Sequence, residues 1–308
     1  MVIATRITTG ALGAALVLLV PATPAVSAGA TGTSDSATAT VGRLVLEPSS
    51  RGYQGELPVT ITNPTDSYVS HVLITEPVAG SWRGTTSDEF CLVTVPKQFV
   101  RTFDCALPIG PGETYSVTAR FEVLTRTRPY AMSAGGGQVA VQVGYDSPTT
   151  TTAAYRTVFR GTTGSLRHPR PYEPDASTRA SIAVGEARLT RQADGRWAGW
   201  LPVTVRYRGD APHSHLEVRA ALPAGLDMEA TDPADLPVFA TGFVVPGGRF
   251  MAGEVRTFRV LVTAPAGTAP GTLGTGEFVL APWYEGGDVP EATPRDNVAT
   301  FPIEASGS

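Results

Sequence analysis

One stretch of this chain occurs twice in almost the same form. Residues 53–61 read YQGELPVTI, and residues 197–205 read WAGWLPVTV. Other landmarks keep the same order in both halves: residues 41–42 match 184–185, residues 77–80 match 223–226, and residues 111–113 match 252–254. An internal repeat constrains the architecture before any single residue is interpreted, because each copy forms the same structural unit. The repeat therefore predicts two copies of one domain.

Apolar and polar residues alternate in both copies. The alternating segments are residues 56–61, 115–123 and 138–143 in the first copy, and 201–205, 216–220 and 255–262 in the second. A period of two buries one face of a strand and leaves the other in water. Turn residues such as Asn63-Pro64 and Asp194-Gly195 separate these segments. The pattern predicts an all-β fold: two tandem Ig-like antiparallel β-sandwich domains joined by a Pro-containing linker.

The chain divides into five expected parts. Residues 10–20 are an apolar run, too short to span a membrane and followed by the small residues Val26-Ser27-Ala28, which is typical of a signal peptide. A retained N-terminal anchor is the alternative. We expect a signal peptide at 1–28, a disordered tail at 29–37, the first sandwich at 38–160, an extended linker at 161–178 and the second sandwich at 179–306.

The charge balance argues against nucleic acid as a partner. Asp and Glu number 28 against 24 Lys and Arg, and no basic stripe interrupts the chain. No segment after the signal peptide is long and apolar enough to span a membrane. We expect a secreted, extracellular protein, at most loosely associated with a cell envelope.

Cys91 and Cys105 are the only cysteines, and both lie in the first copy. An exported protein with two cysteines most often joins them in a disulfide bond. Closing a loop of about 15 residues would stabilise the fold by about 3 kcal/mol. Redox or metal chemistry is the alternative, although a CxxC spacing and a third ligand are missing.

Several of these motifs together resemble a known family. They are Asn63-Pro64-Thr65, the turns at 77–80 and 223–226, Cys91 followed by residues 105–113, and the closing residues 296–300. The chain resembles the Ig-like conserved repeat domains of bacterial, actinobacterial-type secreted and cell-surface proteins, a family of unknown function. The resemblance covers nearly the whole mature chain and implies a spacer, stalk or adhesive module without catalytic residues. The second copy departs from the pattern by lacking the cysteines, and the first by lacking the closing Asp-Asn.

Trp200 is the strongest candidate for ligand binding. Leu201, Val203 and Val205 carry the core face of their strand, so Trp200 points outward, where the first copy has Glu56. An exposed Trp can stack on a sugar ring or pack against a partner. Packing against the linker or the first domain is the alternative. Trp283 and Tyr284 either join Trp200 in a sugar-binding platform or cover a sheet edge.

Two groups of polar residues could hold a metal ion, each with a simpler alternative. His213 and His215 would share one face of a strand, or they form a solvated strand start. A calcium ion would suit oxygen ligands from Asp288, Glu291, Asp296 and Asn297, or these residues form a polar turn. Motifs of metalloproteases, nucleotide-binding loops and serine hydrolases are missing from the sequence. We expect no cofactor and no enzyme activity.

Two functions follow from these observations. The favoured interpretation is a secreted, non-enzymatic Ig-like protein that acts as an extracellular surface-interaction, adhesion or spacer module. The alternative is a secreted carbohydrate-binding protein that uses Trp200, Trp283 and Tyr284. The partner would be an extracellular protein or a cell-envelope polysaccharide.

Overall fold

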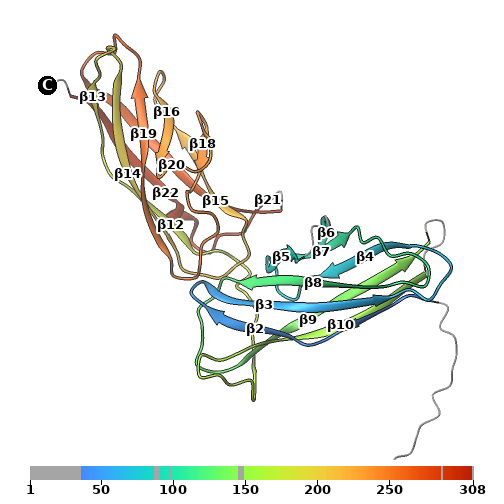
Figure 1. The fold of residues 1–308 in the computed structure, drawn as a ribbon. Helices are drawn as coiled ribbons and strands as arrows, with labels where there is room; N and C mark the ends of the chain where they lie inside the picture. The colour runs from blue at the N-terminus through green and yellow to red at the C-terminus, as the bar shows by residue number, and fades with distance from the viewer. Residues whose placement is uncertain (1–35, 87–90, 98, 145–148, 286, 307–308) are drawn as a thin grey trace, which may run out of the picture. The chain divides into compact units, whose positions relative to one another are not determined.

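Two β-sandwiches follow one another along the chain (Figure 1). The structure is a computed structural model and describes residues 36–306 apart from 87–90, 98, 145–148 and 286. The predicted signal peptide at 1–28 and most of the predicted tail lie outside the described residues. The prediction of an all-β fold with two sandwich domains is confirmed.

The first sandwich contains eleven strands. They are β1 Thr38–Val41, β2 Leu44–Ser49, β3 Gly52–Thr62, β4 Val69–Thr75, β5 Trp82–Thr85, β6 Cys91–Lys97, β7 Val100–Cys105, β8 Thr114–Val123, β9 Met132–Val143, β10 Thr149–Phe159 and β11 Arg170–Pro171. Strands β5, β8, β3 and β1 form one layer, and β10, β9, β4, β7 and β6 form the other. Strand β2 pairs with both layers: its start runs parallel to β10 and its end antiparallel to β3.

The second sandwich repeats this arrangement. Its elements are β12 Ala180–Val184, β13 Ala187–Arg191, β14 Trp197–Tyr207, β15 His215–Ala221, β16 Asp227–Asp232, β17 Val238–Phe239, β18 Gly242–Val244, β19 Val255–Ala264, β20 Gly271–Tyr284, β21 Gly287–Asp288, the 3₁₀ turn η1 Pro294–Asn297 and β22 Val298–Ala305. The order β16-β19-β14-β13-β22-β20-β15-β18-β17 matches β5-β8-β3-β2-β10-β9-β4-β7-β6 strand for strand. The two sandwiches therefore share one topology, whereas their origin by duplication stays a prediction.

The repeated Gly-x-Leu-Pro motif lies opposite the break between the first two strands of each sandwich, β1 and β2 or β12 and β13. In the second sandwich, β12 covers β14 from Val203 onward and β13 covers only its first residues, so residues 199–202 have no strand on that side. Pro202 fits this gap, because proline lacks the N–H that a neighbouring strand would need. A Cβ on Gly199 would lie 2.1 Å from the Arg188 carbonyl oxygen, so only glycine allows β13 to approach so closely. Gly55 and Pro58 hold the same places in β3.

Alternation along the central strands builds the two cores. In β14, Leu201, Val203 and Val205 are fully buried. The opposite layer contributes Phe278 and Phe301, whose rings meet edge to face. Each core is a separate cluster of buried side chains. At about 25 cal/mol per Å² of apolar surface, burial of these side chains dominates the free energy that holds each sandwich together.

Cys91 and Cys105 form the predicted disulfide bond. They lie directly opposite each other on β6 and β7, and Cys105 also pairs with Val72 on β4. The bond therefore cross-links the β6–β7 hairpin at the edge of its layer, where β7 also pairs with β4.

The structure differs from the expected domain boundaries in two places. Ala37, expected in the disordered tail, is 1% exposed, and its carbonyl accepts a hydrogen bond from the Thr151 hydroxyl. The expected linker at 161–178 is partly built into the first sandwich, because Arg170 and Pro171 pair with Met132 and Ser133 of β9. A two-residue strand that contains proline has no alternating pattern, so the sequence did not reveal it.

Candidate functional site

A shallow hollow surrounds Trp200 on the outer face of the β14 layer. It has a volume of about 460 Å³. We call it the Trp200 hollow, and its lining residues are Arg188, Thr190, Gln192, Arg196, Ala198, Gly199, Trp200, Glu229 and Leu261. The hollow opens beside residues 199–202, where β14 has no neighbouring strand on one side. The break in strand pairing at the repeat motif therefore leaves the space that forms the hollow.

Trp200 is the exposed aromatic residue of this hollow. The residue is 40% exposed, as predicted from the alternation, and lies opposite Leu261 of β19. The guanidinium carbon of Arg259 lies 5.2 Å from the centre of the indole ring, and Arg259 also pairs with Asp232. A cation held over the ring restricts the indole, so less side-chain entropy is lost when a ligand stacks on it.

Polar side chains surround the indole ring. The Arg196 guanidinium donates to Asp194 and Glu229 at 2.9 and 2.8 Å. The Gln192 amide donates to the Thr190 carbonyl at 3.1 Å. Carboxylate, amide and guanidinium groups supply both acceptors and donors, which is what sugar hydroxyls require. The hollow therefore combines a stacking surface with fixed hydrogen-bonding groups.

The corresponding hollow of the first sandwich lacks the aromatic residue. It has a volume of about 630 Å³ and is bordered by Gln54, Gly55 and Glu56. Glu56 pairs with Arg120 at 3.5 Å across the strands, at the place where Trp200 faces Leu261. Phe121 borders this hollow but is 1% exposed, so its ring is unavailable for stacking. At this surface the two sandwiches have the same backbone arrangement but carry different side chains.

The structure does not bring Trp283 and Tyr284 to Trp200. Trp283 lies on the outer face of β20, in the other layer of the sandwich, and stacks on His215 at 6.4 Å between ring centres. Tyr284 is 4% exposed, and its hydroxyl donates to the Phe99 carbonyl at 2.8 Å. The expected platform of three aromatic residues therefore reduces to Trp200 alone.

His213 is buried, contrary to the predicted solvated strand start. Its Nδ1 lies 3.0 Å from the Ala211 carbonyl, and its Nε2 accepts the Phe250 amide at 2.9 Å. Both ring nitrogens are occupied, so the pair with His215 cannot bind a metal ion in this arrangement. Burial and, to a lesser extent, the nearby charge of Arg249 lower the pKa of His213 to about 4. The ring is neutral at pH 7.

The carboxylates of Asp288 and Glu291, two of the residues considered for calcium, have structural partners, whereas the buried Asn297 Oδ1 has no hydrogen-bond partner among the described residues. Asp288 pairs with Arg219 at 2.6 Å. Glu291 accepts hydrogen bonds from the Thr178 hydroxyl and the Ala180 amide, and Asn297 donates to the Leu280 carbonyl. No group of three or more His, Cys, Asp or Glu residues within the described ranges could hold a metal ion. These contacts fit the polar turn that was the alternative.

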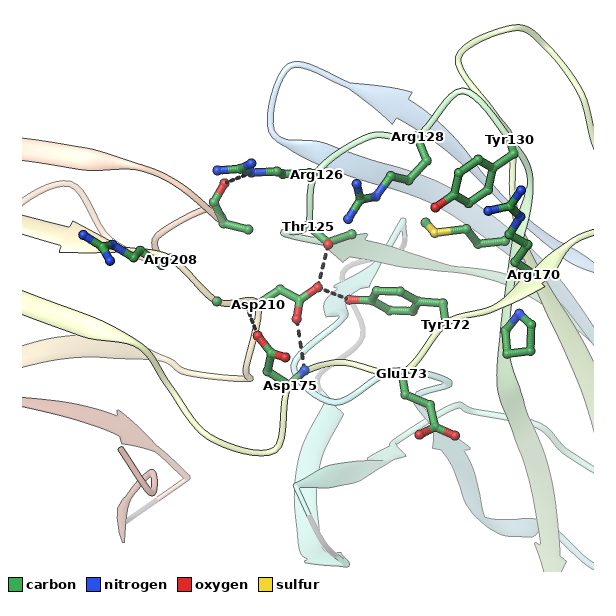
Figure 2. Close-up of a pocket in the computed structure, with 14 residues that line it drawn as sticks. Thr125, Arg126, Arg128, Tyr130, Arg170, Tyr172, Glu173, Asp175, Arg208 and Asp210 are labelled. Atoms are coloured by element: carbon green, nitrogen blue, oxygen red, sulfur yellow. Dashed lines mark hydrogen bonds between the residues drawn. The ribbon is translucent and has the colours of Figure 1, made fainter. Parts of the chain in front are cut away.

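A second pocket, which we call the junction pocket, lies where residues of both sandwiches meet the segment 170–175 (Figure 2). It has a volume of about 470 Å³. Four arginines and three acidic residues line it: Arg126, Arg128, Arg170, Arg208, Glu173, Asp175 and Asp210. Arg170 lies over the Tyr130 ring, 4.0 Å from its centre. The opposite charges nearly cancel, so the pocket favours no ligand of either sign.

Asp210 is the central residue of the junction pocket. Its carboxylate accepts hydrogen bonds from the Thr125 hydroxyl at 2.6 Å, the Tyr172 hydroxyl at 3.1 Å and the Asp175 amide at 3.0 Å. Figure 2 marks these bonds with dashed lines. Burial raises the pKa of Tyr172, and the charge of Asp210 raises it further. Tyr172 therefore stays protonated and donates to Asp210 throughout the physiological range.

Most neighbours of Trp200 in its hollow could not be identified from the sequence. The predicted turn at Asp194-Gly195 joins β13 to β14, so Thr190 and Gln192 lie near Arg196. Glu229 and Arg259 come from two other strands, and only the pairing of β19 with β14 and of β16 with β19 places them there. No local pattern could have identified them.

No protein-family model and no curated protein matches the chain. Among solved structures, the chain is similar to the CupB6 tip adhesin of Pseudomonas aeruginosa at 8% identity, with a TM-score of 0.31 over 89% of this chain and 99% of that one. It is similar to CfaE, the adhesive subunit of CFA/I fimbria of enterotoxigenic Escherichia coli, at 10% identity, with a TM-score of 0.24 over 86% and 98%. A GH20 exo-β-N-acetylglucosaminidase from Vibrio harveyi matches 51% of this chain at 8% identity, with a TM-score of 0.24. The chain spans only 26% of that enzyme. Similarities at these scores carry no argument about function.

Within the described part of the chain, no helix has the length and apolar character needed to cross a membrane.

Proposed function

We propose that this chain is a non-enzymatic extracellular adhesion module that binds cell-envelope or cell-surface polysaccharide at the Trp200 hollow. The observation that carries the proposal is an exposed indole, held by Arg259 and bordered by Gln192, Arg196 and Glu229. Sugars present apolar ring faces and a rim of hydroxyls, and this surface offers a complement to both.

The contrast between the two sandwiches supports the same proposal. The backbone forms the same gap in both, yet only the second sandwich places an aromatic ring beside it. An exposed aromatic ring that is bordered by hydrogen-bonding groups suits a ligand with both an apolar face and polar substituents. The first sandwich, with Glu56 paired to Arg120 at this position, then serves as the spacer that carries the binding domain.

The disulfide supports an extracellular location. Disulfide bonds form and persist in oxidising compartments and are rare in the cytosol. The bond between Cys91 and Cys105 is therefore what an exported module would contain, together with the signal peptide predicted at residues 1–28.

Retention on insoluble polysaccharides and on peptidoglycan tests the proposal. We expect the protein to pellet with at least one of these materials, and Trp200→Ala to weaken its affinity at least about tenfold, which corresponds to about 1.4 kcal/mol. Trp200→Phe keeps an aromatic ring and should retain part of the affinity.

Phe239→Ala is the matched control, because Phe239 is an aromatic residue that is 63% exposed on β17, in the other layer. Its retention should equal that of the unchanged protein. Absence of retention on every glycan would argue against carbohydrate binding. Equal losses in Trp200→Ala and Phe239→Ala would point to nonspecific hydrophobic adsorption.

A further inference from the structure

A small pocket near the junction of the sandwiches contains three arginines and no acidic residue. It has a volume of about 200 Å³ and is lined by Gly80, Arg83, Arg101, His213, Ser214, Arg249 and Tyr284. We call it the Arg249 pocket. Arg83 and Arg101 come from β5 and β7, whereas Arg249 precedes β19. The junction pocket differs, because three acidic residues line it together with its arginines.

Arg249 has no anionic partner in the part of the chain that the structure describes. Its Nε is buried without a hydrogen-bond partner. Burial and, to a lesser extent, repulsion by Arg83 lower the pKa of Arg249 to about 10. A guanidinium group removed from water without a counter-ion destabilises a protein, so such groups are normally paired.

The neighbouring carboxylates are already engaged by other groups. Glu76 has a fully buried side chain, accepts the Gly80 and Trp82 amides at 2.9 Å and pairs with Arg101 at 3.0 Å. Glu285 pairs with Arg101 at 2.9 Å, and Glu122 pairs with Arg83. Among the described residues, the guanidinium of Arg249 is therefore left without an ion pair of its own, although the charge of Glu122 acts on it, and its Nε lacks a hydrogen-bond partner.

We propose that the Arg249 pocket binds a tetrahedral oxyanion, a phosphate or sulfate group, either free or as an ester on a larger molecule. Such an anion accepts hydrogen bonds in several directions, which suits guanidinium groups that converge from different elements. The Ser214 hydroxyl borders the same space and adds a neutral donor. His213 contributes shape rather than charge, because both of its nitrogens are occupied within the protein.

The bound anion would contact residues of both sandwiches. Arg83 and Arg101 belong to the first sandwich, and Ser214 and Arg249 belong to the second. Anion binding would therefore stabilise the junction as well as satisfy Arg249. The Arg249 pocket and the Trp200 hollow share no lining residue. Anion binding in the pocket therefore does not depend on glycan binding in the hollow.

Isothermal titration with inorganic phosphate tests the site at pH 7 and constant ionic strength. We expect saturable binding to the unchanged protein and a thermal unfolding midpoint that rises with phosphate concentration, because a ligand of the folded state stabilises it. Arg249→Gln should weaken the affinity at least about tenfold. Arg206→Gln, which changes an exposed arginine of β14, should leave it unchanged.

A measurement without anion separates the proposal from a structural role for Arg249. If an anion is the missing partner, Arg249→Gln removes an uncompensated charge, so its unfolding midpoint in phosphate-free buffer should equal or exceed that of the unchanged protein. A lower midpoint would show that the protein itself compensates the charge and would overturn the proposal.

Glycerol 3-phosphate and acetate complete the comparison. Tighter binding of glycerol 3-phosphate than of inorganic phosphate assigns the pocket to a phosphate ester, and the reverse order assigns it to the free ion. Both results support an oxyanion site. Equal binding of acetate, equal affinity in Arg249→Gln, or no saturable binding of phosphate or sulfate would overturn it.

Discussion

His213 shows how burial determines the chemistry of a single residue. The imidazole is 3% exposed and bonded at both nitrogens, by the Ala211 carbonyl and the Phe250 amide. Protonation would place a charge in a buried site and remove the acceptor that the Phe250 amide needs. The folded protein therefore keeps this side chain neutral well below its ordinary pKa.

This neutral histidine predicts acid sensitivity. The folded state takes up the His213 proton only near pH 4, whereas the unfolded chain takes it up near pH 6.5. The unfolded state thus binds more protons between these values, so the free energy of unfolding falls as pH decreases from about 6.5 to about 4. The loss amounts to about 3 kcal/mol at most. Denaturant titrations at several pH values measure it.

His213→Gln removes this contribution, because an amide can supply a donor and an acceptor but does not titrate. The pH slope between about 6.5 and 4 should become shallower in that variant. His168→Gln, at an exposed position, is the matched control and should keep the original slope. A slope that does not change in His213→Gln would contradict the assignment.

At the scale of elements, the gap beside β14 and β3 is the feature that both sandwiches share. At one end of the gap, β13 and β2 come so close that glycine is required at 199 and at 55, where a Cβ would lie 2.1 and 2.3 Å from a backbone oxygen. A backbone atom cannot move aside as the end of a flexible side chain can. The glycine of the repeat motif therefore keeps β13 and β2 close to their neighbours.

Gly199→Ala tests this requirement. The added methyl group forces β13 away from β14, and overpacking of this kind costs about 1–3 kcal/mol of folding free energy. Denaturant unfolding measures the loss. Gly135→Ala is the control, because a Cβ there meets nothing within 4 Å. Equal stabilities of the two variants would show that β13 can shift at no cost.

The sequence predicted those strands in which alternation and burial coincide. Residues 115–123 and 255–262, for example, lie within β8 and β19, because each strand packs one face on a core. Strand β11 was missed because Arg170-Pro171 is too short to alternate. At the candidate site, the outward direction of Trp200 followed from its neighbours in the strand. The position of Tyr284 could not be predicted from the sequence, because its partner Phe99 lies 185 residues away in the chain.

At the scale of the whole molecule, the segment between the sandwiches is held by polar contacts. Asp210 joins Thr125 of the first sandwich to Tyr172 and Asp175 of the segment. Arg101 similarly pairs with both Glu76 and Glu285. Hydrogen bonds to charged groups contribute about 1.5–3 kcal/mol each when they are buried. The segment is therefore expected to open rarely in the folded protein.

Limited proteolysis tests this expectation. Asp210→Ala removes the acceptor for three donors, so cleavage within residues 161–178 should become at least about tenfold faster, as expected for a loss of 1.4 kcal/mol or more in local opening. Asp66→Ala, at an exposed position, is the control and should be cut at the original rate. Equal cleavage rates for Asp210→Ala and the control would show that the contacts of Asp210 do not restrain the segment.

At the gap between β12 and β13, the residues that would determine ligand specificity are different from those that stabilise the fold. Leu201, Val203 and Val205 pack in the core, whereas Trp200, at the gap, faces solvent. Changes at residue 200, and at Thr190 or Glu229 beside it, leave the buried side chains in place. A library randomised at these three positions should therefore yield folded proteins that recognise different ligands. The strands around the gap would keep the same backbone in every variant and support an engineered binding surface.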